Sequence, residues 1–230
     1  MSHVDATMST PIVALENAQL SYPTPDGEVP VLRGLGITVS PGEIVAVTGP
    51  SGSGKSSLIA IIGGLEQATG GAINVLGHDL TAASEAERTA LRRRDIGIVF
   101  QSYHLVPAMT ALQNAALPLM LAGETNATAK ASAMLDRVGL GHRLTHRPSA
   151  LSGGEQQRVA IARAFVAEPK LVLADEPTGN LDRETGIEVA ETMFKLVRET
   201  GAAMLMVTHD PDMASRCDRT VAIDGGRVIG

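Results

Sequence analysis

Short apolar runs alternate with helix-like segments along most of the chain. Four runs are bounded by glycine or polar residues, as is typical of buried strands, and they lie at residues 44–47, 96–100, 170–174 and 203–207. Apolar positions at helical spacing occur between and after these runs, at residues 55–64, 155–167 and 183–200. This alternation predicts an α/β fold in which helices cover both faces of a mainly parallel sheet.

The two ends of the chain predict further strands. Residues 12–22 and 31–39 have strand-like patterns and are separated by the breaker segment 23–27. A final pair of strands is expected at residues 220–223 and 227–229, with a turn at Gly225 and Gly226. We expect no internal repeat and no linker between these elements.

A long helical region interrupts the alternation of strands and helices. Residues 110–151 have a helical pattern broken at Pro118, Gly123 and Gly139, which predicts a helical subdomain inserted at about residues 102–160. Upstream of it, Ser84 and Glu87 form a capping-box pattern that predicts the start of a short helix. Arg92, Arg93 and Arg94 would form the solvated C-terminal end of that helix, where cations are favourable.

Composition and charge exclude several classes of protein. The 230 residues are 44% hydrophobic and 19% charged, which suits a globular protein and excludes a disordered one. The net charge of −6 argues against a general nucleic-acid binder. The single cysteine, Cys217, excludes a disulfide framework and is expected to be an inert, buried thiol. The polar residues 1–11 are expected to form a flexible tail and not a secretory signal.

The four apolar runs all end in glycine or in polar side chains. Ligands of parallel sheets bind at the carboxyl ends of the strands, so these endings are expected to form one active-site edge. The groups that follow the runs are Gly49, Gln101, the pair Asp175 and Glu176, and the pair Thr208 and His209.

The first ending matches a phosphate-binding loop. Residues 49–56, Gly-Pro-Ser-Gly-Ser-Gly-Lys-Ser, fit the pattern GxxxxGK[ST] between a predicted strand and a predicted helix. Glycines allow backbone N–H groups to surround a phosphate, and the helix dipole adds to the attraction. Lys55 would reach the terminal phosphates and the Ser56 hydroxyl would bind Mg²⁺. The preceding strand argues against a simple Gly/Ser linker.

The third ending supplies two adjacent carboxylates. Asp175 and Glu176 follow a buried strand, and beside a P-loop we assign Asp175 to Mg²⁺ and Glu176 to the attacking water. Without the P-loop, a surface acidic pair would explain them equally well.

A second candidate anion site begins the helix after residue 152. In the segment 151–158, Leu-Ser-Gly-Gly-Glu-Gln-Gln-Arg, Ser152 is a plausible N-cap and the two glycines allow close approach of an anion. The physical chemistry leaves open a simple capped helix, a contribution to the chain's own site, or a contribution to a partner's site.

Taken together, these motifs resemble the ordered motif set of ABC-type ATPases, over about residues 12–230. The Leu-Ser-Gly-Gly-Glu-Gln segment is the most specific of them, because many other NTPases also carry P-loops. The resemblance implies a P-loop NTPase core with a mainly parallel sheet, an N-terminal antiparallel β subdomain and an inserted helical subdomain. It also implies hydrolysis of ATP with Mg²⁺.

The resemblance further implies roles for residues that bind the nucleotide. Tyr22 would stack on adenine. The loop of residues 49–57 would hold the phosphates through Gly49, Pro50, Ser51, Gly52, Ser53, Gly54, Lys55, Ser56 and Ser57. Ser152, Gly153 and Gly154 would contact the γ-phosphate bound to the other protomer of a head-to-tail homodimer that holds two ATP molecules, and Asp182 would cross the dimer interface.

Three residues would act in hydrolysis and its control according to the same resemblance. Glu176 would be the catalytic base, and His209 would touch the γ-phosphate. Gln101 would contact both Mg²⁺ and the attacking water and would sense a membrane partner.

Segments 100–107, 174–182 and 206–210 resemble the lipoprotein-release and macrolide-export group of these ATPases. That likeness implies the ATPase subunit of a transporter or mechanotransmission complex, for export or for lipoprotein and envelope processes. It further implies an integral membrane permease as partner, a peripheral location at the cytoplasmic face of the inner membrane, and no nucleic acid. The patch expected to grip the permease comprises Tyr103, Leu105, Val106 and Met109. The alternatives are a soluble ABC ATPase of DNA repair or translation, and the ATPase subunit of an importer.

Overall fold

The structure, a computed structural model, describes residues 10–25 and 27–229. Its larger sheet has six strands in the order β10-β9-β3-β8-β7-β6. These strands are β3 (Ile44–Thr48), β6 (Ile96–Phe100), β7 (Leu171–Asp175), β8 (Ala203–Val207), β9 (Arg219–Asp224) and β10 (Arg227–Ile229). All neighbouring pairs are parallel except β9 and β10, so the predicted mainly parallel sheet is confirmed.

Alternate residues of the central strands face two separate apolar cores. In β7, Leu171 and Leu173 belong to the core on one face, whereas Val172 and Ala174 belong to the core on the other. Such strands are apolar on both faces because helices or a second sheet cover each face. This explains why the runs show no polar alternation.

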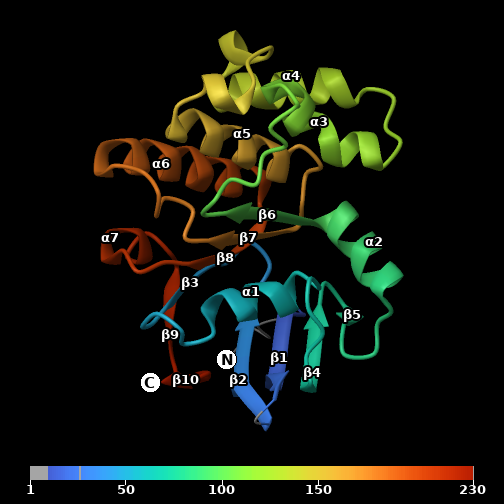
Figure 1. Cartoon of the computed structure of the whole chain (residues 1–230), viewed down its shortest axis with the longest axis vertical. Coiled ribbons are helices and arrows are strands. Elements are labelled where there is room, and N and C mark those ends of the chain that lie inside the picture. The colour runs from blue at the N-terminus through green and yellow to red at the C-terminus, as the bar shows by residue number, and fades with distance from the viewer. Residues whose placement is uncertain (1–9, 26, 230) are drawn as a thin grey trace, which may run out of the picture.

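A smaller antiparallel sheet lies below the central one in Figure 1, with α1 (Lys55–Ile62) between the two. Its strand order is β2-β1-β4-β5, formed by β1 (Val13–Thr24), β2 (Gly27–Val39), β4 (Gly70–Val75) and β5 (His78–Asp79). In the expected breaker segment, Pro23 and Thr24 end β1, Pro25 is in a turn, and Gly27 begins β2. The sequence analysis did not predict β4 or β5, because two glycines begin β4 and β5 has only two residues.

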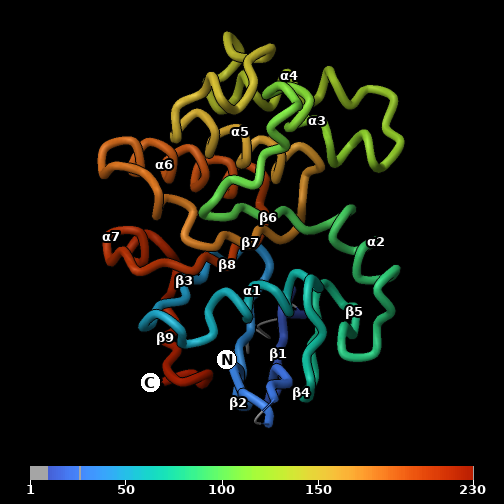
Figure 2. Tube along the Cα trace, in the orientation of Figure 1, coloured from blue at the N-terminus to red at the C-terminus, as the bar shows by residue number. Residues whose placement is uncertain are grey.

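Helices form the upper part of the molecule, above the central sheet (Figure 2). They are α3 (Ala111–Leu121), α4 (Ala127–Arg137) and α5 (Gly153–Phe165), with 3-10 turns at Gly141–Arg143 and Pro148–Ala150. Gly123 and Gly139 adopt positive φ angles directly after α3 and α4, as expected for residues that interrupt helices. The prediction of a break at Pro118 is wrong, because α3 continues through it. The boundary near residue 160 falls within α5 and stays a prediction.

The remaining helices lie against the sheet. They are α2 (Glu85–Asp95), α6 (Arg183–Thr200) and α7 (Pro211–Ala214). The capping box predicted for α2 is present. The Ser84 hydroxyl accepts a hydrogen bond from the backbone N–H of Glu87, and the Glu87 carboxylate accepts one from the backbone N–H of Ser84. Arg92 is less solvated than expected, since its guanidinium donates to the carbonyl of Gly64.

Residues 1–9 of the expected N-terminal tail lie outside the described residues. Within the described ranges, no helix is both long enough and apolar enough to cross a bilayer.

Candidate active site

The carboxyl ends of four adjacent parallel strands meet at one edge of the central sheet. Val47, Val207, Asp175 and Phe100 stand in register across β3, β8, β7 and β6. The groups that follow these strands are therefore brought to a common edge, as the sequence predicts.

The loop between β3 and α1 depends on glycine at two positions. Gly49 has a φ of 148°, and a Cβ there would lie 2.0 Å from the carbonyl oxygen of Ile223. Gly54 has a φ of 98°, and its Cβ would lie 2.8 Å from the Leu32 side chain. No side chain caps α1 and no acidic residue lies in its first turn. Its first N–H groups are thus free of an internal anion, which leaves a site for phosphate.

Lys55 is buried beneath this loop. Its ammonium donates hydrogen bonds to the carbonyls of Gly49 at 2.9 Å and Pro50 at 2.8 Å. The Ser53 hydroxyl is also buried, and it has no hydrogen-bond partner among the described residues. The loop thus holds a fixed cation and an unpaired donor, both suited to an anion.

Asp175 ends β7 close to the start of α1. Burial raises the pKa of its carboxyl group and the Glu176 carboxylate adds to that effect, whereas a hydrogen bond from Ser56 and the charge of Lys55 oppose it. A half-buried carboxylate beside a hydroxyl forms a hard-oxygen donor pair of the kind that suits Mg²⁺. No group of three or more His, Cys, Asp or Glu side chains in the described ranges could hold a metal. The two oxygens therefore suit an ion that is also held by phosphates.

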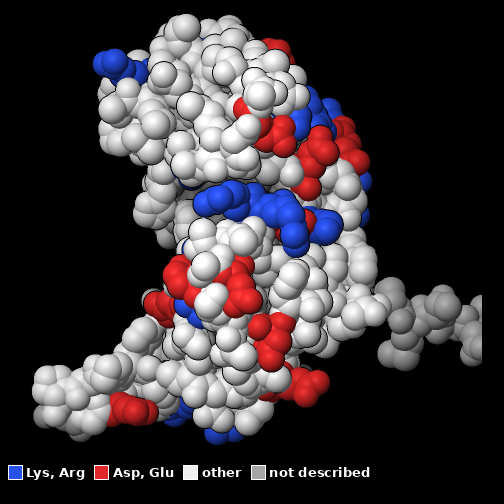
Figure 3. All heavy atoms as spheres, turned by 90° about the vertical axis from the view of Figure 1, so that its right-hand side faces the viewer, with Lys and Arg blue, Asp and Glu red and all other residues white. Residues whose placement is uncertain are grey.

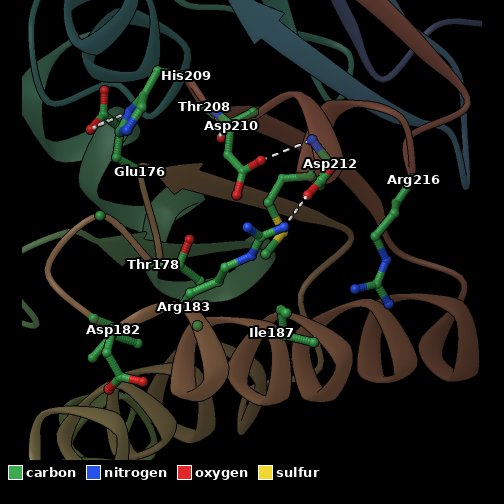
Figure 4. Close-up of a pocket in the computed structure, with 14 residues that line it drawn as sticks. Glu176, Thr178, Asp182, Arg183, Ile187, Thr208, His209, Asp210, Asp212 and Arg216 are labelled. Carbon is green, nitrogen blue, oxygen red and sulfur yellow. Dashed lines mark hydrogen bonds and ion pairs between the residues drawn. The ribbon is translucent and has the colours of Figure 1, made fainter.

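Glu176 and His209 face each other directly (Figure 4). The His209 ring nitrogen Nδ1 lies 3.2 Å from Oε2 of Glu176. Glu176 has a φ of 45°, an unusual value for a residue with a side chain, and its N–H donates to the Val207 carbonyl at 3.0 Å. Strained backbone of this kind persists only where surrounding contacts hold it, and it is common at active sites.

Gln101 lies beside Glu176 across a glycine. A Cβ on Gly179 would lie 2.8 Å from Nε2 of Gln101 and 3.3 Å from Oε2 of Glu176. Nε2 of Gln101 donates to Oδ1 of Asn180 at 3.1 Å, and Nδ2 of Asn180 returns a bond to the Gln101 carbonyl at 3.0 Å. This pairing uses the amide N–H, so the amide oxygen is the atom available to a metal ion or water.

Two hollows meet at the Glu176–His209 pair. The first, of about 590 Å³, is lined by Val31, Gly49, Ser51, Gly52, Gly54, Lys55, Ser56, Ser57, Glu176 and His209. The second hollow, of about 420 Å³, is drawn in Figure 4. Glu176 and His209 line it as well, together with Asp182, Arg183, Arg216 and others. The first hollow joins an anion cradle to a carboxylate and an imidazole, an arrangement suited to hydrolysis of a phosphate anhydride.

The segment that begins α5 does not line the first hollow of its own chain. Ser152 caps α5: its hydroxyl accepts from the Glu155 N–H at 3.2 Å, and the Glu155 carboxylate accepts from the Ser152 N–H at 2.8 Å. That second bond, with Arg143, lowers the pKa of Glu155. Gly154 is required for packing, since its Cβ would lie 2.4 Å from the Thr185 side chain on α6. The contribution to its own site, left open above, is therefore absent from this arrangement.

Asp182 lines the second hollow. Tyr22 does not line the first hollow, but it lies beside Ser57, which does. Tyr22 is 39% exposed, and its hydroxyl donates to Glu66, a bond that raises the pKa of the phenol. Ser57, the last residue of the predicted phosphate loop, is close enough to hydrogen-bond the same hydroxyl. Asp182 caps α6 by accepting from the Thr185 N–H at 3.1 Å.

Three contributors to this region were missed in the sequence. Val31 lines the first hollow, Asn180 pairs with Gln101, and Glu66 pairs with Tyr22. Asn180 lies in the family-like segment 174–182, but nothing in that segment predicts its pairing with Gln101. Val31 and Glu66 belong to no motif, and the Tyr22–Glu66 and Gln101–Asn180 bonds each join segments far apart in the chain.

The expected permease patch is partly turned inward. Leu105 packs against the helical core, and both the N–H and the carbonyl of Val106 are paired with the buried side chain of Asn114. Tyr103 reaches α5, since a Cβ on Gly153 would lie 3.0 Å from its hydroxyl. Apolar side chains that are more exposed lie at the C-terminal end of α3, at Met120 and Leu121.

Comparisons with known proteins agree with this geometry. The profile of the ABC transporter family matches residues 32–179. The lipoprotein-releasing system ATP-binding protein LolD 2 of Caulobacter vibrioides is 47% identical over 223 residues, which cover 96% of this chain and 98% of the relative. The uncharacterized ABC transporter ATP-binding protein YbbA of Escherichia coli is 45% identical, over 94% of this chain and 96% of the relative.

Solved structures show the same fold. The dimeric structure of the ATP-binding cassette MJ0796 in a post-hydrolysis state, bound to ADP and Pi, superposes with a TM-score of 0.88. It is 36% identical in sequence and covers 95% of this chain and 97% of its own. The P-loop α/β fold with an inserted helical region is thereby confirmed.

Proposed function

Because the chain belongs to the ABC transporter family, we propose that it is the ATP-hydrolysing subunit of a transport system of the lipoprotein-release type. It would couple ATP binding, dimerisation and hydrolysis to an integral membrane permease. The observation that carries this proposal is the hollow in which the P-loop of residues 49–56 faces the Glu176–His209 pair. Relatives named as lipoprotein-releasing ATP-binding proteins support the class of system.

The P-loop would bind the triphosphate through its backbone. Phosphate oxygens would accept from the free N–H groups at the start of α1 and from the Ser53 hydroxyl. Lys55 would exchange its bonds with the Gly49 and Pro50 carbonyls for bonds with phosphate. Tyr22, near Ser57, would stack on the base.

Ser56, Asp175 and Gln101 would hold Mg²⁺ through their side-chain oxygens. When bound, the ion would neutralise charge on the phosphates during their transfer to water. The same positive charge would favour the ionised form of Asp175, whose pKa burial raises.

Glu176 would orient the attacking water and accept its proton at Oε2. His209, 3.2 Å from that oxygen, would hold the carboxylate in place and contact the terminal phosphate. Gln101, across Gly179, would fix the water from the other side.

A second copy of the chain would complete each site. Ser152, Gly153 and Gly154 lie outside the hollow of their own chain, so we propose that they contact the nucleotide of the partner in a homodimer. Asp182, in the hollow next to Glu176 and His209, would lie at the interface.

The permease would bind beside the helical region, with the subunit peripheral to the cytoplasmic face of the inner membrane. Figure 3 shows basic side chains gathered in a band across this face, below the helical region. A hollow of about 300 Å³ combines Arg92, Arg93 and Arg163 with the apolar side chains of Leu117 and Leu121. We propose that it receives an amphipathic, acidic cytoplasmic segment of the permease, which matches both its charge and its apolar side.

The Glu176→Gln variant tests the proposed function. Glutamine keeps the shape of the side chain but cannot accept a proton, so ATP should bind without turnover and hold the dimer together. Size-exclusion chromatography with ATP and Mg²⁺ should show a dimer, and hydrolysis should fall at least about 100-fold. Unaltered hydrolysis would contradict the role of Glu176, and a monomer under all conditions would contradict the shared site.

A further inference from the structure

One buried amide joins three segments of the site. Gln157, in the second turn of α5, is 0% exposed. Its Nε2 donates to the carbonyl of Pro177 at 2.5 Å and to that of Phe100 at 3.3 Å. Pro177 directly follows Glu176, and Phe100 directly precedes Gln101. The helix that begins at Ser152 is thus bonded to the backbone beside both residues.

The position requires a double donor. Two carbonyl oxygens converge on the Gln157 nitrogen, while its own oxygen Oε1 is buried without a partner among the described residues. Turning the amide over would place that oxygen against both carbonyls. A carboxylic acid of the same length has one proton at most, so among side chains of this shape only glutamine supplies both N–H groups. The unpaired oxygen is a cost that the two bonds offset.

Both anchored segments contain strained backbone. Glu176 has a φ of 45°, and Tyr103 and His104, just after Gln101, have φ values of 58° and 48°. Arg163, two turns further along α5, donates to the carbonyls of Tyr103 at 2.7 Å and His104 at 2.6 Å. The loop that carries Gln101 is therefore held by α5 on both sides. Conformations of this kind last only while such contacts persist.

We infer that Gln157 is a positioning residue that sets Gln101 and Glu176 relative to each other and to α5. A shift of α5, whose N-terminus carries Ser152, would move both segments together through this one amide. The inference rests on the proposed roles of Gln101 and Glu176. It adds a residue that contacts neither nucleotide nor water.

The Gln157→Met variant tests this inference, because methionine keeps the length of the side chain but donates no hydrogen bond. We expect kcat for ATP to fall roughly 10- to 100-fold, as follows from small misplacements of catalytic groups. The dissociation constant for ATP should change less than about twofold, since Gln157 makes no contact with the P-loop. Hydrogen exchange should accelerate in residues 100–104 and 176–180.

Two further variants separate positioning from general destabilisation. Leu135→Ala opens a cavity in α4, remote from the site, and should lower the melting temperature while kcat stays within about twofold below that temperature. Gln157→Asn shortens the side chain by one methylene and so withdraws the amide from both carbonyls. It should also lower kcat, and it replaces Gln157→Met as the test if the methionine variant does not fold. The inference is overturned if folded Gln157 variants keep kcat, or if Leu135→Ala loses as much.

The roles on which the inference depends are measured in the same assay. If Gln101→Ala and Glu176→Gln both retain full turnover, the proposed function of the site is wrong. If they lose turnover while Gln157→Met and Gln157→Asn do not, only the positioning role is wrong.

Discussion

Burial of the Asp175 carboxylate, the proposed Mg²⁺ ligand, lowers the stability of the protein at neutral pH. Its pKa is raised above its ordinary value of 3.8, so the native state binds this proton more tightly than the unfolded chain does. Stability is therefore highest below the unfolded pKa, and it falls as the pH rises from that value through the raised pKa of the folded state. At neutral pH the charged group therefore destabilises the metal-free fold.

Asp175→Asn should accordingly have opposite effects on stability and activity. In EDTA at pH 7 the variant should melt at a higher temperature than the unmodified chain, and the difference should vanish near pH 3. Magnesium-dependent hydrolysis should be lost, because a neutral amide is a weaker ligand than a carboxylate. Paired thermal melts and phosphate-release assays measure both effects; a lower melting temperature at pH 7 would contradict the pKa argument.

Tyr22 permits a separate test of base stacking. Tyr22→Ala should weaken nucleotide binding by about 1–3 kcal/mol, to a similar degree for ATP and GTP, because every base offers a π-face. Tyr22→Phe is the matched control: it keeps the ring and removes only the hydroxyl bonded to Glu66, so affinity should change little. Titration with a fluorescent ATP analogue measures both variants, and unchanged affinity in Tyr22→Ala would exclude stacking.

At the scale of elements, α5 performs several tasks along its length. Its N-cap Ser152 is proposed to contact the nucleotide of a partner, Gln157 bonds to the backbone beside Glu176, and Arg163 bonds to the loop after Gln101. The cap is also a structural feature, so a Ser152 variant alone would not distinguish the two roles.

A matched pair of variants distinguishes them. Ser152→Ala and Ser84→Ala both remove a capping-box serine, and each should cost about 1 kcal/mol of stability. Only Ser152→Ala should also weaken the ATP-bound dimer of the Glu176→Gln chain. Sedimentation with ATP compares Ser152→Ala and Ser84→Ala, each combined with Glu176→Gln. If the two double variants dimerise equally, Ser152 has only its structural role as a cap.

The sequence predicts best where function and local pattern coincide. The strands that lead into Gly49, Gln101, Glu176 and His209 are marked by apolar runs, and the motif residues after them are fixed in spacing. Gln157 has no such mark, although it lies inside the segment 151–158. Its role depends on carbonyls 57 and 20 residues away, which no local pattern encodes.

Elements held by long-range pairing are predicted less well than helices with caps. α6 begins at its predicted residue because Asp182 is a capping residue at its start. β4 is formed by pairing with β1, more than 50 residues earlier, and its own residues include two glycines and an asparagine. Local propensity therefore opposes the strand that the fold requires.

The whole molecule presents one face on which charge and exposed apolar residues combine. Leu121 is 63% exposed at the end of α3, beside the arginines that end α2. Leu121→Asp should cost little stability, because exposed substitutions rarely do, and should leave nucleotide binding unchanged.

The same variant should lose co-purification with the permease from detergent extracts and lose hydrolysis stimulated by it. Ile229→Asp, at a side chain 51% exposed on β10, is the control for an added charge elsewhere. Retention of the permease by Leu121→Asp would place the contact on another surface.

The Ser152 segment lies outside the nucleotide hollow of its own chain. This affects how a mutant and a normal allele combine when both are expressed in one cell. Each proposed site draws on two copies of the chain. When the concentration of the chain is well below the dissociation constant of the dimer, the number of assembled sites scales with the square of that concentration. Halving expression then removes about three quarters of the sites. An allele that binds ATP without releasing it also captures normal copies. Such an allele therefore lowers activity further than an allele that never folds, which removes only its own copies.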